Sequence, residues 1–545
     1  MRYQKIRKEI AGIDPAVFMP ALLLTLLLAL VFSLWPEQSG SLLHQIHAFT
    51  TNELGWFFLL ATIGAISFCL YLAMSRYGKV VLGDRDTRPE FSTLTWLGMI
   101  FTSGTGGSLL YLSAAEWIWI MQSPPFGAEP GSAEAARWAS AFGMFHWGPS
   151  AWAWYIACAI PIGYAMYVRK QRNLKLSELT RPVLGRWADG LVGHAINFLY
   201  MFGIIGGVMT SIALGTPLIS STFAYAFGMQ AGNPVLDVFV IFLWTAIPMM
   251  ALILGLQKGV ARLSNFNVRL DIALLVGVLA CGPLSFTLNQ SVDGLGLMLQ
   301  NFVYMSFATD VIRNTGFPQA WTIFYFSWWV VYALPYGLFI AKISRGRTIR
   351  GIVFAGLVAG SLGCMVFYMV FPAFGIHLQT SGQLDLIAVM NEAGRGEVVK
   401  AMLEQLPAAG LFIVVFGLVA LLSYVSGQCA VGYSLASATQ KTLLPEQEAS
   451  RYNASFWLVL VGLVSTALYF LNPESLTPLQ TISILTGFPL CFVIAIVGRS
   501  FMLMLNRDLF NETAVRDIDG KKYLTPTTTG IDAPVNTGAV SPELD

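Results

Sequence analysis

Six aromatic residues in the apolar segment 316–341 are spaced so that their rings face one way. At about 100° per residue along a helix they project onto an arc of roughly 100°: Trp321, Tyr325, Trp328, Trp329, Tyr332 and Tyr336. Ring faces carry negative electrostatic potential and bind a quaternary ammonium at about 0.5–2 kcal/mol per contact. Trp328 and Trp329 fall at the middle of the segment, where anchoring at the membrane interface does not explain them. A cage for a cation and ordinary aromatic core packing both remain open.

A second aromatic group lies in the segment 144–168. Trp147, Trp152 and Tyr155 fall within an arc of roughly 140° if the segment is one helix. This group repeats the pattern of the segment 316–341. The same two interpretations apply to it.

Glycine interrupts the apolar segment 95–122. Ser103-Gly104-Thr105-Gly106-Gly107-Ser108 replaces helix-forming residues at its centre and predicts a break in the helix. Irregular backbone at membrane depth is tolerated where it lines a cavity, and such breaks form the binding sites of secondary transporters. The alternative is a face of small residues for helix packing. Together with the aromatic groups, the break favours a solute that carries a bulky cation and an anionic tail.

Few ionisable residues compete with this interpretation. Glu116, Arg269 and Asp271 lie within or at the edge of apolar segments, where such residues are candidates for function. His146 is either a packing residue or a proton carrier. The basic run 343–350 suits contact with lipid headgroups. The sequence shows no nucleophile with a partnered base, no phosphate-binding loop and no zinc spacing, so we expect no enzyme activity and no cofactor.

The elements that must position these residues are membrane spans. The 545-residue chain is 55% hydrophobic and 11% charged, less than half the usual charge of a soluble domain. Its net charge of +2 argues against a nucleic-acid partner. Apolar blocks near the roughly 20 residues of a span predict an all-α polytopic membrane protein with twelve transmembrane helices, at 14–35, 54–76, 95–122, 144–168, 190–219, 233–256, 267–290, 316–341, 350–373, 407–436, 453–471 and 478–505.

The distribution of Lys and Arg predicts the orientation. Basic residues precede the first segment and follow the second, fourth, sixth and eighth, whereas loops such as 36–52 and 220–232 hold almost none. We therefore expect both termini in the cytoplasm. The division is a cytoplasmic N-terminus at 1–13, a transporter domain at 14–505 and a polar, mobile cytoplasmic tail at 506–545.

Several motifs resemble those of the betaine/carnitine/choline transporter family. The signature is Ser327-Trp328-Trp329 followed by Ile343-Ser344-Arg345-Gly346-Arg347-Thr348. Further motifs are similar to the carnitine/γ-butyrobetaine antiporter branch: Pro124-Pro125-Phe126-Gly127, Phe145-His146-Trp147-Gly148-Pro149, Gly255-Leu256-Gln257-Lys258-Gly259 and Gly316-Phe317-Pro318-Gln319. The resemblance implies a leucine-transporter-like fold of two inverted five-helix repeats, spans three to seven and eight to twelve, usually as a homotrimer. It also implies a location in the bacterial cytoplasmic (inner) membrane.

The resemblance also assigns site residues. The family's central aromatic box corresponds to Trp147, Trp152, Tyr155, Trp328, Trp329 and Tyr332, with Trp119 where the carnitine branch has Tyr. Trp321 matches a second, outward-facing substrate site of that branch. Choline-preferring members have Asp in the glycine segment, where this chain has Ser108. The resemblance therefore favours a zwitterion, with its carboxylate near Gly104, Thr105, Gly106 and Ser108.

The chain departs from the family where an ion is bound. Sodium-coupled members resemble Thr-Ser-Ala-Asp-Ser in span ten, and this chain has Val425-Ser426-Gly427-Gln428-Cys429, which lacks one hydroxyl and the carboxylate. Thr102, Thr105 and Ser426 keep oxygens that suit sodium. Sodium-independent antiporters have Arg in span seven and Met in span eight, where this chain has Asn267 and Tyr336, with Arg269 two residues away.

These patterns predict a secondary transporter of a carnitine- or betaine-like zwitterion that works by alternating access. We expect sodium-independent exchange, and a sodium-coupled betaine symporter is the alternative. A substrate sensor that binds without transport is the alternative from another class. Sodium is the metal ion that the retained oxygens suit, and proton coupling stays open.

Overall fold

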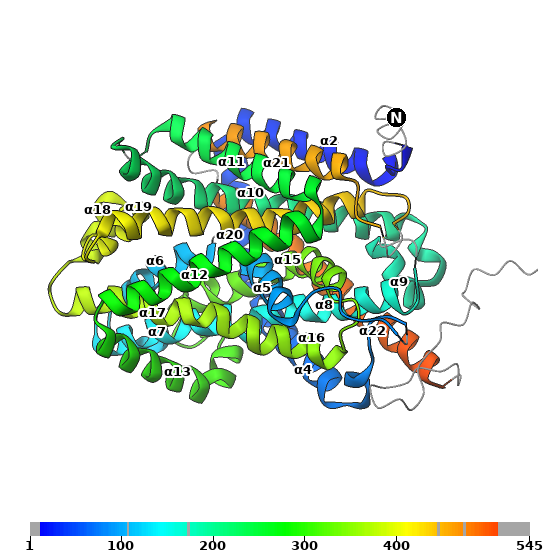
Figure 1. Cartoon of the computed structure of the whole chain (residues 1–545), viewed down its shortest axis with the longest axis horizontal. Helices are drawn as coiled ribbons and strands as arrows, with labels where there is room; N and C mark the ends of the chain where they lie inside the picture. Colours follow the sequence, from blue (N-terminus) through cyan, green and yellow to red (C-terminus); the bar gives the residue numbers. More distant parts are fainter. Residues whose placement is uncertain are drawn as a thin grey trace, which may run out of the picture.

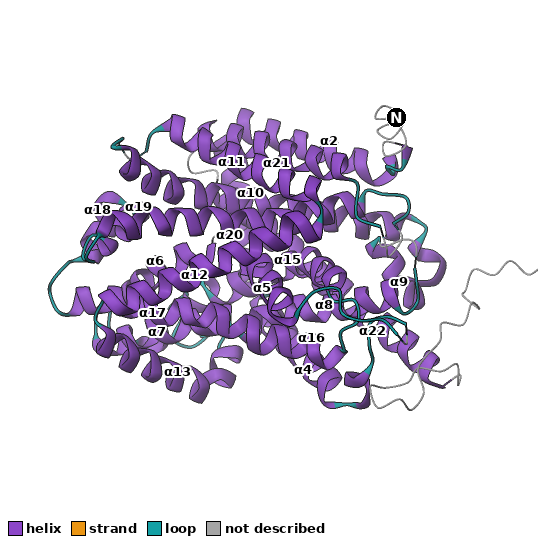
Figure 2. Ribbon diagram, in the orientation of Figure 1, coloured by secondary structure: helices purple, strands orange, loops and turns teal. Residues whose placement is uncertain are grey.

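The computed structural model describes residues 11–84, 86–105, 108–171, 175–230, 232–443, 447–471 and 476–510. Helices make up nearly all of this part of the chain (Figure 2), and its β-type pairing consists of two isolated bridges, Ile13 with Gln440 and Val81 with Thr348. Eight of the described helices are long and apolar enough to cross a membrane, judged by length and composition. The chain is an all-α polytopic membrane protein, as predicted.

The first half of the chain forms the following elements. These are α2 (Pro15–Leu34), α3 (Pro36–Glu53), α4 (Gly55–Met74), η1 (Arg76–Lys79), α5 (Thr93–Thr105), α6 (Ser108–Gln122), η2 (Pro125–Gly127), α7 (Ala133–Trp147), α8 (Pro149–Tyr167), α9 (Leu176–Leu184), η3 (Gly185–Ala188), α10 (Leu191–Phe227), α11 (Pro234–Leu254), η4 (Leu256–Val260) and α12 (Ala261–Cys281).

The second half continues without strands among the described residues. Its elements are α13 (Leu284–Phe307), α14 (Phe317–Ala320), α15 (Thr322–Ile343), α16 (Ile349–Phe354), η5 (Ala355–Gly360), α17 (Ser361–Thr380), α18 (Leu386–Ala393), α19 (Arg395–Leu403), α20 (Ala409–Ala438), α21 (Arg451–Leu471) and α22 (Leu476–Phe510). The segments η4 and η5 are π-helical.

Every predicted span overlaps a helix, but two boundaries were wrong. The segment 267–290 runs from α12 into α13, because Gly282 and Pro283 end α12 after Cys281; the residue before a proline is disfavoured in helical geometry. The segment 144–168 joins the end of α7 to α8, which Gly148 and Pro149 separate. The predicted loop 36–52 is also helical, since Pro36 and Glu37 suit the first turn of α3.

The helix α15 forms the centre of the molecule. It lies in the middle of the view in Figure 1 and packs against α8, α20 and α5. In the apolar window of Phe317–Ile343, 94% of the residues are buried, compared with 33% for Gly55–Met74. The aromatic face of α15 is therefore enclosed by protein. Gly337 permits the close approach of α8, since a Cβ there would lie 2.6 Å from the Cβ of Cys158.

Candidate functional site

A narrow pocket lies beside the aromatic face of α15. The space open to the centre of a water-sized sphere is about 20 Å³, room for about one water molecule. None of the described residues that line the pocket is charged. They are Gly104, Ser108, Trp147, Val208, Ser211, Trp328, Trp329, Tyr332, Tyr336, Tyr424, Gly427, Gln428 and Val431.

Three tryptophans form one wall of the pocket. The rings of Trp147 and Trp329 lie 4.7 Å apart with an interplanar angle of 73°, an edge-to-face arrangement. Trp328 and Trp329 lie 5.5 Å apart with nearly parallel rings, at 16°. The indole N–H of Trp329 donates to the backbone oxygen of His146 at 3.1 Å and so ties α15 to the end of α7. This hydrogen bond fixes the orientation of the Trp329 ring, whose face is predicted to contact the cation.

Hydroxyl groups are brought together farther along α15. Tyr332 and Tyr336 stack at 5.1 Å and 8°, and the hydroxyl oxygen of Tyr332 lies 2.7 Å from that of Ser211 on α10. The hydroxyl of Ser108 also donates to that of Tyr424 at 3.5 Å, which joins the start of α6 to α20. The pocket is therefore lined by aromatic faces and by neutral hydrogen-bonding groups.

Trp147 reaches the pocket by a route that the sequence analysis did not predict. The arc of 144–168 assumed one helix, which is wrong, because Trp147 is the last residue of α7 and α8 begins at Pro149. Proline has no N–H, so it suits the first position of a helix and interrupts a helix interior. The break turns Trp147 toward Trp329.

Trp152 and Tyr155 lie behind the pocket lining. A Cβ built on Gly104 or on Gly360 would come within 2.8 or 2.7 Å of the Trp152 ring, so the indole fits between two glycines. Its N–H donates to the sulfur of Cys364 at 3.4 Å. The ring of Tyr155 stacks edge-on against Tyr336 at 5.2 Å and 81°. Both residues shape the pocket from outside, and neither lines it.

The backbone between α5 and α6 was predicted to break. Gly104 and Ser108 line the pocket, as expected for this segment. The break itself falls on Gly106 and Gly107, which lie outside the described residues, as does the side chain of Thr105. The break stays a prediction.

Trp119 contacts Trp321. Its ring is 5.8 Å from the ring of Trp321, and both side chains are half-buried. Neither residue lines the central pocket. Tyr325 connects the two regions, with its ring 6.3 Å from Trp321 and 5.5 Å from Trp329. Trp119 therefore lies beside Trp321, and the binding roles predicted for both residues stay predictions.

A buried polar network lies next to the tryptophan wall. The carboxylate of Glu116 on α6 is fully buried and accepts hydrogen bonds from the hydroxyls of Tyr325 at 2.6 Å and Tyr368 at 2.7 Å. Nδ1 of His146 lies 3.4 Å from the same carboxylate, and Nε2 lies 3.1 Å from the hydroxyl of Thr322. Glu116 and His146 therefore belong to one hydrogen-bonded network. The sequence alone presented them as two separate candidates for function.

The residues proposed for ion coupling separate into two groups. Asn267, Thr102 and Ser426 are buried, and Thr102 lies 2.9 Å from Ser264 of α12. The hydroxyl of Ser426 donates to the backbone oxygen of Leu422 at 3.0 Å. Arg269 is exposed on the other side of α12 and does not join this group, because two residues turn a helix by about 200°.

Several lining residues were missed as site residues. Tyr336 continues the spacing of Tyr332 by four positions, and Gln428 belongs to the span-ten segment already compared with the family, so both were within reach. Ser211 and Tyr424 come from α10 and α20, and no local pattern marks them. Their place in the pocket depends on how distant helices pack.

The arrangement of an uncharged, aromatic-lined pocket inside a helical membrane protein agrees with the sequence comparison. The family profile of the BCCT, betaine/carnitine/choline family transporters matches residues 16–510. The match includes every described helix except the first residue of α2. Members of this family are transporters and not enzymes, and their solutes are of the betaine, carnitine and choline type. The chain belongs to the betaine/carnitine/choline transporter family.

Proposed function

We propose that this protein carries a quaternary-ammonium zwitterion, such as carnitine or betaine, across the bacterial cytoplasmic membrane by alternating access. The ammonium group is held against Trp147, Trp328 and Trp329. The carboxylate lies near Gly104 and Ser108. As the basic residues predict, both termini face the cytoplasm, and the family resemblance favours a homotrimer in the lipid bilayer.

The observation that carries this proposal is the absence of charge among the described residues that line the pocket. A zwitterion has no net charge, so it needs no counterion in a medium of low dielectric constant. A cation such as choline would leave a positive charge without a partner. Aromatic faces favour the ammonium group, and the hydroxyls and amide of Ser108, Tyr424 and Gln428 suit a carboxylate.

The pocket is too small for the proposed solute in this arrangement of the helices. A space for about one water molecule does not hold a trimethylammonium group, so the rings must separate when the solute binds. The tight contact of Trp147 with Trp329 represents a closed arrangement. Alternating access supplies such a separation, since the helices that carry the two rings belong to different parts of the chain.

Replacement of Trp329 tests the substrate class. Trp329→Leu should weaken carnitine or betaine binding by roughly 2- to 30-fold while the protein still folds, because it removes the central ring face and one cation–π contact of about 0.5–2 kcal/mol. The measurement is equilibrium binding to the purified protein. Trp187→Leu, which replaces an exposed ring in η3, is the matched control. Unchanged affinity in Trp329→Leu would reject the assignment.

Counterflow in proteoliposomes tests the transport mode. Vesicles loaded with unlabelled carnitine receive labelled carnitine outside, in sodium-free or sodium-containing buffer. The sequence favours sodium-independent exchange, which requires rapid uptake without sodium. Uptake only with sodium supports the symporter, and binding without uptake in either buffer supports the sensor.

A further inference from the structure

The loop between α15 and α16 is bound to the segment between η1 and α5. The N–H of Leu82 donates to the backbone oxygen of Arg347 at 2.9 Å, and the oxygen of Leu82 accepts from the N–H of Gly346 at 2.7 Å. Gly346 has a φ of +77°, and a Cβ there would lie 2.7 Å from the backbone of Arg88. The loop therefore requires glycine at this position, and backbone contacts fix its path.

The side chain of Arg347 binds the start of α5. Its guanidinium donates to the backbone oxygen of Phe91 at 2.8 Å and to the hydroxyl of Thr93 at 3.0 Å. The same group lies 4.5 Å from the centre of the Trp96 ring, which is a cation–π distance. The indole N–H of Trp96 in turn donates to the hydroxyl of Ser344 at 3.0 Å, and both side chains are buried. These five residues, called the clamp below, join α5 to the loop that follows α15.

The clamp depends on the shape of the arginine side chain. Among the described residues, the guanidinium of Arg347 contacts neutral groups: a backbone oxygen, a hydroxyl and an indole ring. A planar guanidinium can donate to two acceptors while one of its faces lies on a ring, and the ammonium group of lysine cannot reproduce this geometry. The run 343–350 suits lipid headgroups by its charge alone. The contacts of Arg347 require more than charge.

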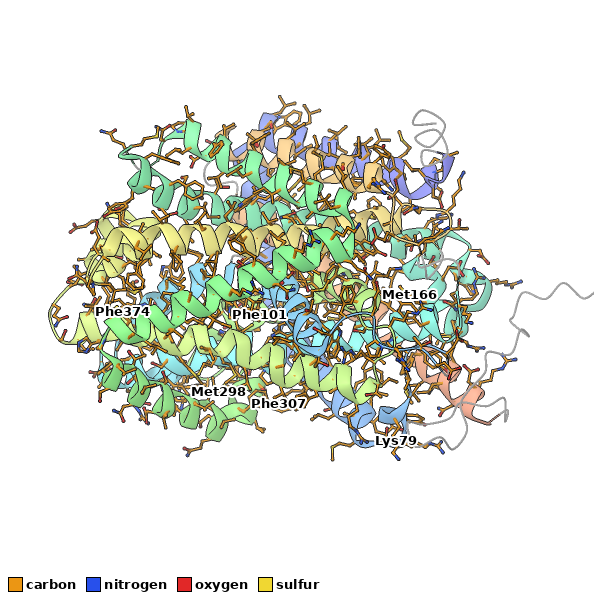
Figure 3. All side chains as sticks on the ribbon, in the orientation of Figure 1. Lys79, Phe101, Met166, Met298, Phe307 and Phe374 are labelled. Atoms are coloured by element: carbon orange, nitrogen blue, oxygen red, sulfur yellow. The ribbon has the colours of Figure 1, made fainter. Side chains whose placement is uncertain are left out.

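The helix α5 connects the clamp to the pocket. It has 13 residues, and Gly104 near its other end lines the pocket. Trp96 and Gly104 are eight positions apart, or about 12 Å at 1.5 Å per residue. Figure 3 shows Phe101 of α5 near the middle of the molecule and Lys79, which precedes the segment bound to the loop, at its edge. A shift at the clamp therefore reaches the pocket through one short helix.

We infer that Arg347 is a positioning residue: through the clamp it holds α5 in the arrangement in which the pocket is closed. In this arrangement the space takes about one water molecule. In transport terms, which rest on the proposed function, α5 must move relative to α15 for the solute to pass on the side of the clamp, which is predicted to be cytoplasmic. The clamp opposes that movement, so its loss raises the population open to the cytoplasm. This role needs no ion and agrees with sodium-independent exchange.

Hydrogen exchange of the purified full-length protein, without solute, tests the clamp directly. Arg347→Ala should speed amide exchange in α5 by about tenfold or more, because hydrogen bonds from a charged group no longer hold the start of the helix. Mass spectrometry of peptides from Thr93–Thr105 measures the rate, and peptides from α21 serve as the internal reference. Arg347→Lys keeps the charge and should behave like Arg347→Ala.

Arg345→Ala is the matched control. It removes the same charge from the same loop, but the guanidinium of Arg345 lies 5.8 Å from the Tyr167 ring and outside the clamp. Exchange in α5 should therefore keep its original rate. An increase in Arg345→Ala equal to that in Arg347→Ala would assign the effect to charge and would reject the inference.

Two further results overturn the inference: unchanged exchange of α5 in Arg347→Ala, or the original rate in Arg347→Lys. If Arg347→Ala does not fold, Trp96→Phe provides the test, because it keeps a ring and removes the hydrogen bond to Ser344. This variant should speed exchange in α5 by about two- to tenfold. An unchanged rate in Trp96→Phe rejects the clamp.

Transport measured from each face separates this inference from the proposed function. In proteoliposomes of known orientation, Arg347→Ala should lower the half-saturating carnitine concentration at the cytoplasmic face relative to that at the outer face, by about tenfold in their ratio. A variant that is only less stable would lose rate and keep this ratio. Faster exchange in α5 without uptake of any zwitterion rejects the proposed function and leaves the positioning role intact. Uptake with an unchanged ratio supports the proposed function and rejects the hold of the clamp on the closed arrangement.

Discussion

Glu116 and Asp271 are both buried carboxylates inside the helical core, yet their surroundings differ sharply. Glu116 accepts two short hydrogen bonds from tyrosine hydroxyls and lies near His146. Asp271 accepts one long hydrogen bond, and its second oxygen has no partner among the described residues. The sequence marks both residues in the same way, so the difference is visible only in the packing.

The comparison separates a carboxylate that its neighbours hold by several hydrogen bonds from one that accepts a single long hydrogen bond. Glu116 joins α6, α7, α15 and α17 through its partners, and the backbone of His146 in turn holds the indole of Trp329. Such a fully bonded network makes a rigid support. Asp271 keeps bonding capacity that its own helices do not use.

The largest expected effect comes from removing each carboxylate in turn. Glu116→Leu leaves two tyrosine hydroxyls and an imidazole without their partner and should lower the free energy of unfolding by about 3–5 kcal/mol. Asp271→Leu loses one weak hydrogen bond and should cost about 1 kcal/mol or less. Denaturant unfolding in detergent measures both values. Equal losses of unfolding free energy in the two variants would show that the two carboxylates do not differ in their structural role.

A smaller effect is expected from the partners of Glu116. Tyr325→Phe and Tyr368→Phe each remove one hydrogen bond to a charged group and should cost about 1.5–3 kcal/mol. Tyr452→Phe, at a residue 38% exposed, should change the free energy of unfolding by less than about 0.5 kcal/mol. The same unfolding measurement applies. If the two buried tyrosines behave like Tyr452, the network does not stabilise the fold.

The smallest effect is expected from Thr322, whose hydroxyl contacts the His146 imidazole on the side away from Glu116. Thr322→Val removes the hydroxyl 3.1 Å from Nε2 of His146 and should cost about 0.5–1.5 kcal/mol. The backbone bond from Trp329 to His146 stays, so zwitterion affinity should change by less than about threefold. Unfolding and binding measurements on one preparation give both numbers. A large loss of affinity at unchanged stability would show that this hydroxyl orients the pocket.

Much of the fold could be predicted, because hydrophobic length and the spacing of rings are local properties. All twelve apolar segments overlap helices. Trp147, Trp328, Trp329 and Tyr332 line one pocket, and their role in substrate binding stays a prediction. The boundaries at Gly148 and Gly282 were missed because the apolar blocks continue past them. The inverted repeats and the homotrimer stay predictions.

The site was harder to predict from the sequence than the fold, because it depends on contacts between segments that are distant along the chain. The network of Glu116 draws side chains from four helices, and no spacing along the chain predicts that they meet. One local signal was readable: Ser264, Asn267 and Asp271 recur at intervals of three and four, which places polar groups on one helix face. Arg269 breaks that interval, and it is exposed.

The indole of Trp152 sets the closest distance between two helical segments of this transporter. It occupies the volume that side chains at Gly104 and Gly360 would take, so the thickness of one ring determines how closely the end of α5 can approach η5. A flat aromatic ring does not compress or change length as a flexible side chain does. Trp152 therefore acts as a rigid spacer. The rigid geometry of its indole ring fixes the position of Gly104 at the edge of the pocket.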